Sequence, residues 1–277
     1  LETATTVVAK EVELARQSEN KEGIRLNLFG GEPFLKFELM KDLCDWIWKN
    51  VTDIKIDIYI TTNGTLLNDE KKEWLKANKD RINIIMSVDG TDDVQECNRG
   101  CDSSALPIKW VLDTLPNRFL SMTVSRKSLD RFADELINFH NLGYHIEAKP
   151  AQGEDWQPGD GKVYEEQLER IAEYYLSHPQ INPIYLFKEL SYVHLLNNEP
   201  NEKYGKTCDA GDKLVAYDVE GRLFPCHHFL PNVNGRSDVL SYLETIDFSD
   251  TTNLQLTTEC LSNLLYVSKI KLPNYIT

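Results

Sequence analysis

Long hydrophobic runs and dense cysteine are both missing from this 277-residue sequence. No run of about 18 apolar residues occurs, so no membrane-spanning helix is expected. The opening residues LETATTVVAK lack the basic start and apolar stretch of a secretory signal. Six cysteines are too few, in a chain of this length, for a disulfide-stapled secreted scaffold. The sequence therefore predicts a cytoplasmic protein with no membrane partner, in which cysteines serve metal binding or catalysis more often than bridging.

A surplus of positive charge is also missing. The chain has 30 Lys and Arg against 44 Asp and Glu, a formal net charge of −14. No nucleic-acid partner is expected, because neutralising phosphates requires a surplus of Lys and Arg. A phosphate-binding GxxxxGKS or GxxxxGKT loop does not occur either. With 41% hydrophobic residues, the composition is typical of a folded globular protein rather than a disordered one.

Apolar strand-like runs alternate with amphipathic helical stretches over the first 150 residues. The predicted strands cover residues 25–29, 54–61, 82–88, 118–125 and 144–150. The predicted helices cover residues 1–18, 35–50, 68–78, 105–114 and 129–142, and Leu35, Leu39, Leu43 and Ile47 form the expected apolar face of the second. Such alternation predicts parallel strands with right-handed crossovers. Because the leading helix has no strand before it, we expect an α/β fold, a partial (β/α)6 TIM-like barrel lacking its first strand.

The remaining residues differ in kind. Residues 151–162 are rich in Gly, Pro and Asp and predict a loop, and a helix is expected over 163–177. The segment KLVAYDVEGRLFPC predicts a β-hairpin that turns at Glu220-Gly221. We therefore expect a barrel domain over 1–180, a bridging helical segment over 181–207 and a small C-terminal α+β lobe over 208–277.

Polar residues and glycines end three successive predicted strands. These segments are FGGEP at 29–33, TTNGTLL at 61–67 and SVDG at 87–90. Gly30 and Gly31 would let a ligand approach the backbone, and Pro33 would begin the next element. A tight turn between strand and helix is the alternative explanation for two glycines alone. Since ligands of β/α barrels bind at the C-terminal ends of strands, the three segments together predict one polar rim.

These segments, in this order and at these intervals, resemble the radical S-adenosylmethionine (radical SAM) superfamily, in particular its branch that modifies peptides and proteins. The segment Asn98-Arg99-Gly100 is similar to a motif of the same branch. The resemblance covers roughly residues 1–150 and a separate stretch near the C terminus. It implies that S-adenosylmethionine binds the open iron of a 4Fe–4S cluster, and that the radical released by one-electron cleavage abstracts a hydrogen atom from a substrate.

The resemblance also implies cofactor contacts and partners. Gly30, Gly31 and Glu32 would face the methionine amino group, and Ser87 would hold the ribose or the carboxylate. The further implied cofactor neighbours are Pro33, Thr62, Asn63, Asp89 and Arg99. The implied partners are a peptide or protein substrate and a reducing protein such as flavodoxin or ferredoxin. No residue is singled out as catalytic.

One departure from the family pattern is that CxxxCxxC, the family's cluster motif, does not occur. Its expected position lies before residue 1, beside the strand that is also missing, and the chain has no initiator Met. We therefore expect an N-terminally incomplete chain that generates no radical by itself. Cys97 and Cys101 have CxxxC spacing, but residue 104 is Ser, so loop or core thiols are expected there. Cys44, on an amphipathic helix, is expected to be a packed thiol.

The C-terminal match is Cys208, Gly221 and Cys226, which fit the Cys-x(9–15)-Gly-x4-Cys signature that opens the SPASM extension. In the family this extension carries auxiliary iron–sulfur clusters. With Cys260 as the third candidate ligand, at most one auxiliary cluster is expected. A zinc site of these cysteines with His227 or His228 is an alternative, although adjacent residues on a strand point to opposite faces. Surface or hydrogen-bonded histidines are the other alternative.

Three hypotheses follow from the sequence. The leading one is an incomplete radical SAM enzyme with a degenerate SPASM-like tail, which in complete form modifies a peptide or protein. The second is a non-catalytic β/α module that binds S-adenosylmethionine or a peptide and has lost the cluster. The third is an unrelated β/α-barrel enzyme such as an aldolase, for which no sequence feature singles out a catalytic Lys.

Overall fold

The computed structural model describes residues 1–18, 23–151, 154–187, 211 and 213–230. The chain divides into two compact units, which we describe separately. The larger unit is Val12–Leu196, and the smaller one combines Leu1–Glu11 with Asn197–Thr277. The three domain ranges expected from the sequence stay a prediction.

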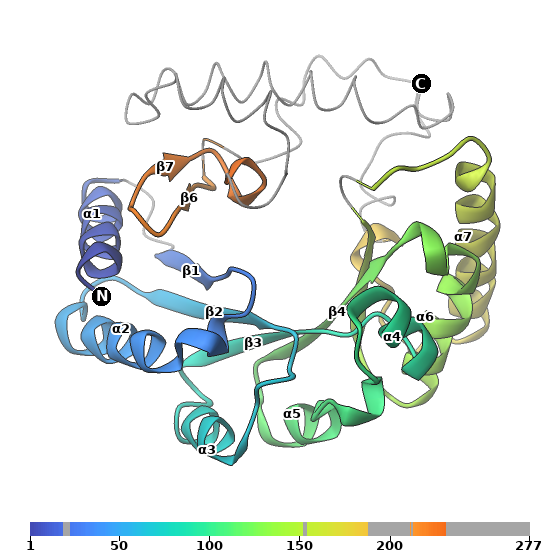
Figure 1. Cartoon of the computed structure of the whole chain (residues 1–277), viewed down its shortest axis with the longest axis horizontal. Helices are drawn as coiled ribbons and strands as arrows, with labels where there is room; N and C mark the ends of the chain where they lie inside the picture. The colour runs from blue at the N-terminus through green and yellow to red at the C-terminus, as the bar shows by residue number, and fades with distance from the viewer. Residues whose placement is uncertain (19–22, 152–153, 188–210, 212, 231–277) are drawn as a thin grey trace. The chain divides into compact units, whose positions relative to one another are not determined.

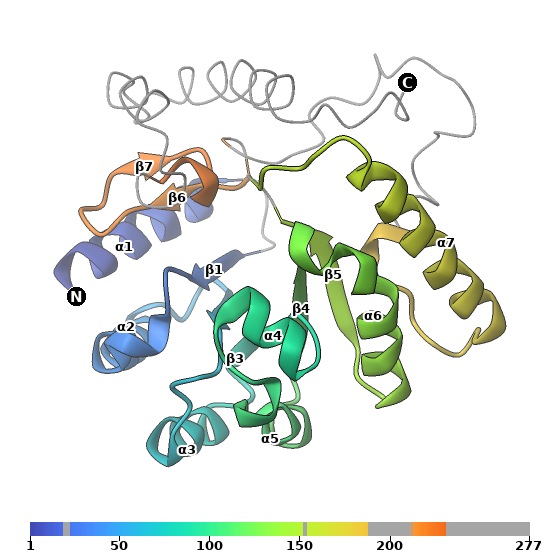
Figure 2. The ribbon, with the colours of Figure 1, turned by 45° about the vertical axis from the view of Figure 1, so that its right-hand side comes forward.

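The larger unit is built on a five-stranded parallel sheet in the order β1-β2-β3-β4-β5. The strands are β1 (Ile24–Leu28), β2 (Ile56–Thr62), β3 (Ile82–Ser87), β4 (Arg118–Val124) and β5 (Ile146–Pro150). The sheet curls, with helices along its outer side (Figures 1 and 2). The predicted α/β partial barrel is therefore confirmed. Among the described residues, no strand comes before β1 in the chain.

Seven α-helices lie wholly within the described residues. They are α1 (Glu2–Gln17), α2 (Phe37–Asn50), α3 (Asp69–Ala77), α4 (Asp92–Arg99), α5 (Ile108–Thr114), α6 (Phe132–Asn141) and α7 (Asp160–Ser177). Short 3₁₀ turns are η1 (Pro33–Lys36), η2 (Ser103–Ala105) and η3 (Arg126–Arg131). Helix α4 was not predicted, because its exposed face is polar and only Val94 and Gln95 are buried. It is nevertheless the helix that carries Arg99.

The expected apolar face of α2 was partly wrong. Leu35 is 69% exposed and Leu39 is 41% exposed. The buried residues of α2 are Phe37, Met40, Leu43, Cys44 and Ile47. An α-helix turns about 100° per residue, so a strict four-residue repeat drifts around the helix by about 40° per step. In addition, Leu35 belongs to the 3₁₀ turn η1, which precedes α2.

The two faces of the sheet differ in polarity. On β3, Ile82, Ile84 and Met86 are buried, whereas the alternate residues are only partly covered. Each fully buried Ile or Met side chain contributes roughly 1.5–3 kcal/mol to folding. The strand register places polar side chains in a row on the partly covered face, at Asn27, Tyr59 and Asn83. A parallel sheet packed on both faces would be almost continuously apolar, so this face is built for contact with water or a ligand.

The smaller unit contains the predicted hairpin. Strands β6 (Ala216–Tyr217) and β7 (Leu223–Phe224) pair antiparallel, and Gly221 turns the chain with φ of +82°. Within this unit, the Tyr217 hydroxyl donates a hydrogen bond to the carboxylate of Glu11 in α1. The predicted turn at Glu220-Gly221 is therefore confirmed.

The residues after the hairpin form a 3₁₀ turn rather than a strand. This turn is η6 (His227–Phe229), and the buried Cys226 precedes it. The expectation that His227 and His228 lie on a strand, with side chains on opposite faces, was wrong because the chain turns directly after Cys226. Among the described residues, no helix is both long and apolar enough to cross a bilayer.

Candidate cofactor site at the strand tips

The three predicted rim segments lie along one edge of the sheet. They follow β1, β2 and β3, which are parallel neighbours, so their C-terminal ends lie side by side. Pro33 begins η1, as the sequence predicted, and Glu32 caps that turn by accepting a hydrogen bond from the Phe34 amide at 3.1 Å. The tips share one edge, which the predicted cofactor site requires.

Glu32 connects the first tip to the second. Its Oε1 accepts a hydrogen bond from Thr62 Oγ1 at 2.8 Å, and its Oε2 accepts one from the Asn63 amide at 2.8 Å. Thr62 is buried, and its hydroxyl oxygen also accepts from the Gly64 amide at 3.0 Å. The carboxylate of Glu32 and the hydroxyl of Thr62 are thus engaged within the chain. Both side chains therefore support the rim.

The glycines at the tips fall into two classes. Gly64 has φ of +79°, and a Cβ there would lie 2.3 Å from Met86 Cε. A Cβ on Gly90 would lie 2.8 Å from Val94 Cβ, so packing explains this glycine as well. Gly30 and Gly31 are exposed, neither has a left-handed φ, and a Cβ on either would meet no atom within 4 Å. Since the chain itself does not require glycine there, the open space fits the approach of a ligand to the backbone.

Asp89 and Arg99 form a charged pair at the tip of β3. The buried Asp89 Oδ1 accepts hydrogen bonds from Arg99 Nη2 and from the Thr123 amide of β4, both at 2.8 Å. Arg99 Nε lies 2.8 Å from Asp89 Oδ2 but makes no hydrogen bond within the described residues, so one hydrogen bond and one close charge contact join the pair. The side chain of Arg99 is 25% exposed, although its Nε is buried. The structure therefore brings together two residues that the sequence selected separately.

Residues next to Arg99 hold it in place. Asn98 Oδ1 accepts a hydrogen bond from Ser125 Oγ at 2.7 Å, and Asn98 Nδ2 donates to Ser128 Oγ at 3.1 Å. Gly100 ends α4 in the left-handed conformation with φ of +70°. Gln95, also on α4, accepts the Asp89 amide hydrogen bond at 2.7 Å. Sequence reasoning missed the supporting roles of Asn98 and Gln95, although the NRG segment was a signal for the first.

Ser87 ends β3 on the partly covered face of the sheet. It is half-buried and pairs in register with Ser121 of β4. Thr62 belongs to the opposite, buried face, because its register partner is Met86. Of these two predicted cofactor neighbours, Ser87 therefore lies on the partly covered face of the sheet, whereas Thr62 lies on the buried face.

The described residues do not contain a set of side chains that could hold an iron–sulfur cluster. Among the described part of the chain, no group of three or more His, Cys, Asp or Glu is placed to hold a metal ion. Cys226 is described and buried, whereas Cys208 and Cys260 lie outside the described residues. The predicted auxiliary cluster and the alternative zinc site therefore stay predictions. The open space at Gly30 and Gly31 is compatible with the predicted cofactor, but the described residues do not supply the ligands of an iron–sulfur cluster.

The remaining described cysteines have structural surroundings. Cys44 is fully buried in α2, and this burial raises the pKa of its thiol to about 12. Cys97 is exposed, and Cys101 accepts a long hydrogen bond from Gln95 Nε2 at 3.8 Å. The prediction of a packed thiol at Cys44 is confirmed, and Cys97 and Cys101 are loop or surface thiols.

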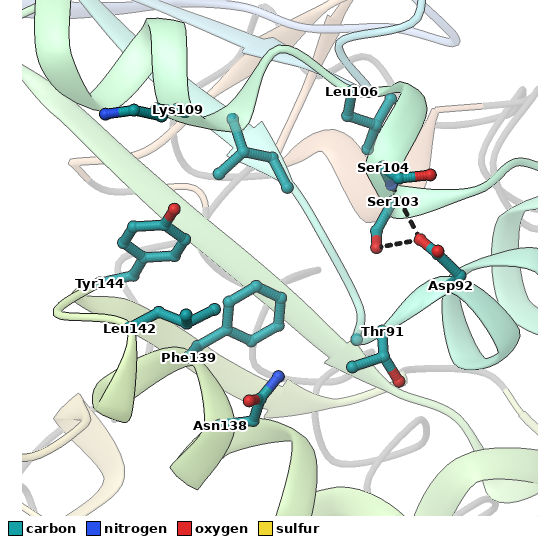
Figure 3. A pocket seen from close by; sticks show the side chains of 12 residues that line it. Thr91, Asp92, Ser103, Ser104, Leu106, Lys109, Asn138, Phe139, Leu142 and Tyr144 are labelled. Atoms are coloured by element: carbon teal, nitrogen blue, oxygen red, sulfur yellow. Dashed lines mark hydrogen bonds between the residues drawn. The ribbon is translucent and has the colours of Figure 1, made fainter.

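A separate depression of about 400 Å³ lies beside the β3 tip (Figure 3). Phe139, Leu142 and Tyr144 stand on one side of it, and Ser103, Ser104 and Leu106 stand on the other (Figure 3). Gly90, Thr91 and Asp92 contribute to its lining, but Gly30, Gly31 and Ser87 do not. The depression therefore shares Gly90 with the predicted rim, but none of the predicted cofactor neighbours lines it.

Comparison with known proteins tests the resemblance. No family model matches the chain. The chain is 27% identical over 256 residues to the radical SAM cyclopropyl synthase TigE of Paramaledivibacter caminithermalis, a match of 87% of this chain and 52% of that protein. It is 28% identical over 222 residues to the GTP 3′,8-cyclase of Clostridium botulinum, covering 76% of this chain and 67% of that protein. The chain is a homologue of radical SAM enzymes. It spans about half the length of TigE.

Solved structures agree with this fold. Native anSMEcpe with bound AdoMet superimposes with a TM-score of 0.64 at 17% identity, covering 93% of this chain and 76% of that one. SuiB of Streptococcus suis bound to its precursor peptide SuiA gives a TM-score of 0.59 at 16% identity, covering 88% and 59%. The partial barrel of this radical SAM homologue is thus the fold of proteins solved with S-adenosylmethionine or a peptide.

Proposed function

We propose that this chain is the S-adenosylmethionine-binding barrel of a radical SAM enzyme that modifies a peptide or protein by hydrogen abstraction. The observation that carries the proposal is the open space beside the backbone of Gly30 and Gly31. Packing within the chain does not require glycine at either position. The homology to radical SAM enzymes supports the same cofactor.

The residues of the rim divide the work of binding. The backbone carbonyls at Gly30 and Gly31 would accept hydrogen bonds from the methionine ammonium, and Ser87 lies on the face where a ribose or carboxylate would be held. Arg99 would offer positive charge to the methionine carboxylate, while Asp89 fixes the orientation of its guanidinium. A bound 4Fe–4S cluster would supply the electron for cleavage. Its three cysteines come, in this proposal, from protein outside these residues.

A peptide or protein substrate is the second part of the proposal. The row of polar side chains at Asn27, Tyr59 and Asn83 on the partly covered face suits a polar substrate. The SPASM-like spacing of Cys208, Gly221 and Cys226 is typical of the peptide-modifying branch. The structural neighbour SuiB was solved with a precursor peptide. A cytoplasmic location and a flavodoxin or ferredoxin as electron donor complete the proposed setting.

Binding of S-adenosylmethionine tests the proposal directly. Isothermal titration calorimetry should give saturable one-site binding to the chain. Gly31→Val should weaken this binding by about tenfold or more, because the added side chain fills the open space at Gly31. The melting temperature of this variant should equal that of the wild type, since no atom lies within 4 Å of the new Cβ. The matched control is Leu142→Ala, an exposed residue outside the rim, which should leave both quantities unchanged. Equal affinity of Gly31→Val and wild type for S-adenosylmethionine would refute binding of the cofactor at the Gly30-Gly31 backbone.

A non-catalytic module that binds S-adenosylmethionine or a peptide is the second candidate. It is favoured by the absence of CxxxCxxC from the 277 residues and of a metal-binding group from their described part. The coding sequence around this segment discriminates the two: a CxxxCxxC motif in the same polypeptide indicates the enzyme. Anaerobic reconstitution of that polypeptide with iron and sulfide should then yield 5′-deoxyadenosine from S-adenosylmethionine and dithionite, which the module would not do.

A further inference from the structure

A buried carboxylate on the outer helical layer reaches the loop that follows β3. Glu135 belongs to α6 and is 3% exposed. Its Oε2 accepts a hydrogen bond from the Thr91 amide at 2.6 Å, and its Oε1 accepts one from Thr91 Oγ1 at 2.9 Å. Both hydrogen bonds span 44 residues of sequence. Glu135 therefore holds Thr91 through its backbone and its side chain at once.

The negative charge of Glu135 is compensated by Arg131, four residues earlier in the chain. Arg131 Nη2 lies 2.5 Å from Glu135 Oε1 and also donates to Thr91 Oγ1 at 3.2 Å. Arg131 is also paired with Asp93, whose Oδ1 lies 3.0 Å from Thr91 Oγ1 and is the alternative acceptor for the single proton of that hydroxyl. Each carboxylate oxygen of Glu135 thus has a donor, and the buried charge is paired, as stability requires.

Gly90 shows how closely Glu135 approaches the loop. A Cβ on Gly90 would lie 2.9 Å from Glu135 Oε2, a separation that real Cβ atoms do not adopt. On the other side of Gly90, Asp89 is held by Arg99 and by the Thr123 amide. The peptide units between Asp89 and Thr91 are therefore fixed at both ends, by β4 and α4 on one side and by α6 on the other.

From this arrangement we propose that Glu135 is a positioning residue for the cofactor site. By holding Thr91, it fixes the end of β3, and with it the Ser87 and Asp89–Arg99 groups that the proposed function assigns to S-adenosylmethionine. Glu135 lies on the helical layer and is not among the cofactor neighbours predicted from the sequence. The inference rests on the proposed function for its ligand, but the rigid hold on Thr91 is testable without any ligand.

The experiment compares Glu135→Ala with Gln167→Ala. Gln167 is the matched control because it is an equally buried polar residue of α7 that accepts the Ala133 amide hydrogen bond at 3.0 Å and has no bond to the β3 loop. Both variants should lower the melting temperature. In Glu135→Ala alone, hydrogen exchange of the Thr91 amide, followed by NMR, should accelerate by about tenfold or more, and S-adenosylmethionine should bind about tenfold more weakly well below the melting temperature.

Glu135→Gln keeps the shape of the side chain and one accepting oxygen, so it should recover part of the affinity and of the Thr91 protection. Unchanged exchange at Thr91 in Glu135→Ala would overturn the inference, as would equal losses of affinity in Glu135→Ala and Gln167→Ala. If the wild-type chain binds no S-adenosylmethionine, the proposed function fails, and the inference fails with it as a statement about that cofactor. The exchange measurement then still decides whether Glu135 holds the β3 tip.

Discussion

Glu32 and Thr62 link the tips of two neighbouring strands through a hydrogen bond of 2.8 Å between Glu32 Oε1 and Thr62 Oγ1. The carboxylate lies in the loop after β1 and the buried hydroxyl belongs to the last residue of β2, 30 residues further along the chain. This bond makes the end of β2 a fixed support for the Gly30-Gly31 backbone. The cofactor rim is thus preorganised by side chains that need not touch the cofactor.

Replacing Thr62 should expose the cost of losing that bond. Thr62→Val removes one donor to Glu32 Oε1, which keeps the Phe34 amide, and leaves the buried Gly64 amide without the acceptor that it has in the wild type. We expect the free energy of unfolding to fall by about 1–3 kcal/mol in urea denaturation. Thr61→Val is the matched control, because Thr61 is only half-buried and makes no side-chain hydrogen bond within the described residues. Equal losses in both variants would contradict the bracing role.

The Asp89–Arg99 pair should contribute far more than an exposed ion pair. Asp89→Asn keeps an acceptor for the Thr123 amide but removes the charge that Arg99 requires. We expect a loss of roughly 2–4 kcal/mol in unfolding free energy, because breaking a buried pair leaves a charge uncompensated. Asp93→Asn, which weakens the exposed pair with Arg131, should change the free energy of unfolding far less. A small effect at Asp89 would indicate that Arg99 is held by other groups.

The two classes of tip glycine should respond oppositely to alanine. Gly64→Ala forces a left-handed residue and an overlap with Met86, so its unfolding free energy should fall by about 1–3 kcal/mol. Gly30→Ala should be neutral or raise stability by up to about 1 kcal/mol, because it restricts the unfolded chain and meets no atom. Thermal denaturation monitored by circular dichroism measures both. A destabilised Gly30→Ala would show that the chain itself needs this glycine.

His140 should make the barrel less stable in acid. Its Nδ1 lies 3.1 Å from the Tyr144 carbonyl, which only accepts, so Nδ1 carries the proton and Nε2 accepts from the Tyr175 hydroxyl at 3.0 Å. That hydroxyl oxygen accepts in turn from the Ile184 amide at 3.1 Å. The imidazole is therefore held in its neutral form. Burial lowers the pKa of His140 below its ordinary 6.5, and the nearby His145 acts in the same direction.

The sign of the effect follows from proton binding. As pH falls below about 6.5, the unfolded chain binds a proton at His140 before the folded chain does, so stability is lost progressively until the folded pKa is passed. Urea denaturation from pH 8 to pH 5 should show this loss. In His140→Asn, whose amide replaces Nδ1 as donor to Tyr144 but does not titrate, the loss should be smaller. Identical pH dependence in both proteins would exclude His140 as its source.

Much of the barrel could be predicted from the sequence because its signals are local. Strands such as Ile82–Ser87 show a two-residue alternation, and most helices show apolar residues at helical spacing. The helix Asp92–Arg99 escaped because polar residues dominate it, and the expected face at Leu35 and Leu39 was misplaced because a strict four-residue repeat leaves the buried side. Local patterns thus define elements better than they define which side of an element is buried.

By itself, the sequence determined the order of the strands and most of the helices. It also determined that the three tip segments lie together, because parallel neighbours must end at one edge of the sheet. Only the tertiary structure decided which tip residues work for the fold: Gly64 and Gly90 serve packing, while Gly30 and Gly31 do not. It alone joined Glu135 to Thr91. A buried polar group takes whichever partner the packing of distant segments brings within hydrogen-bonding distance, and no local pattern records that choice.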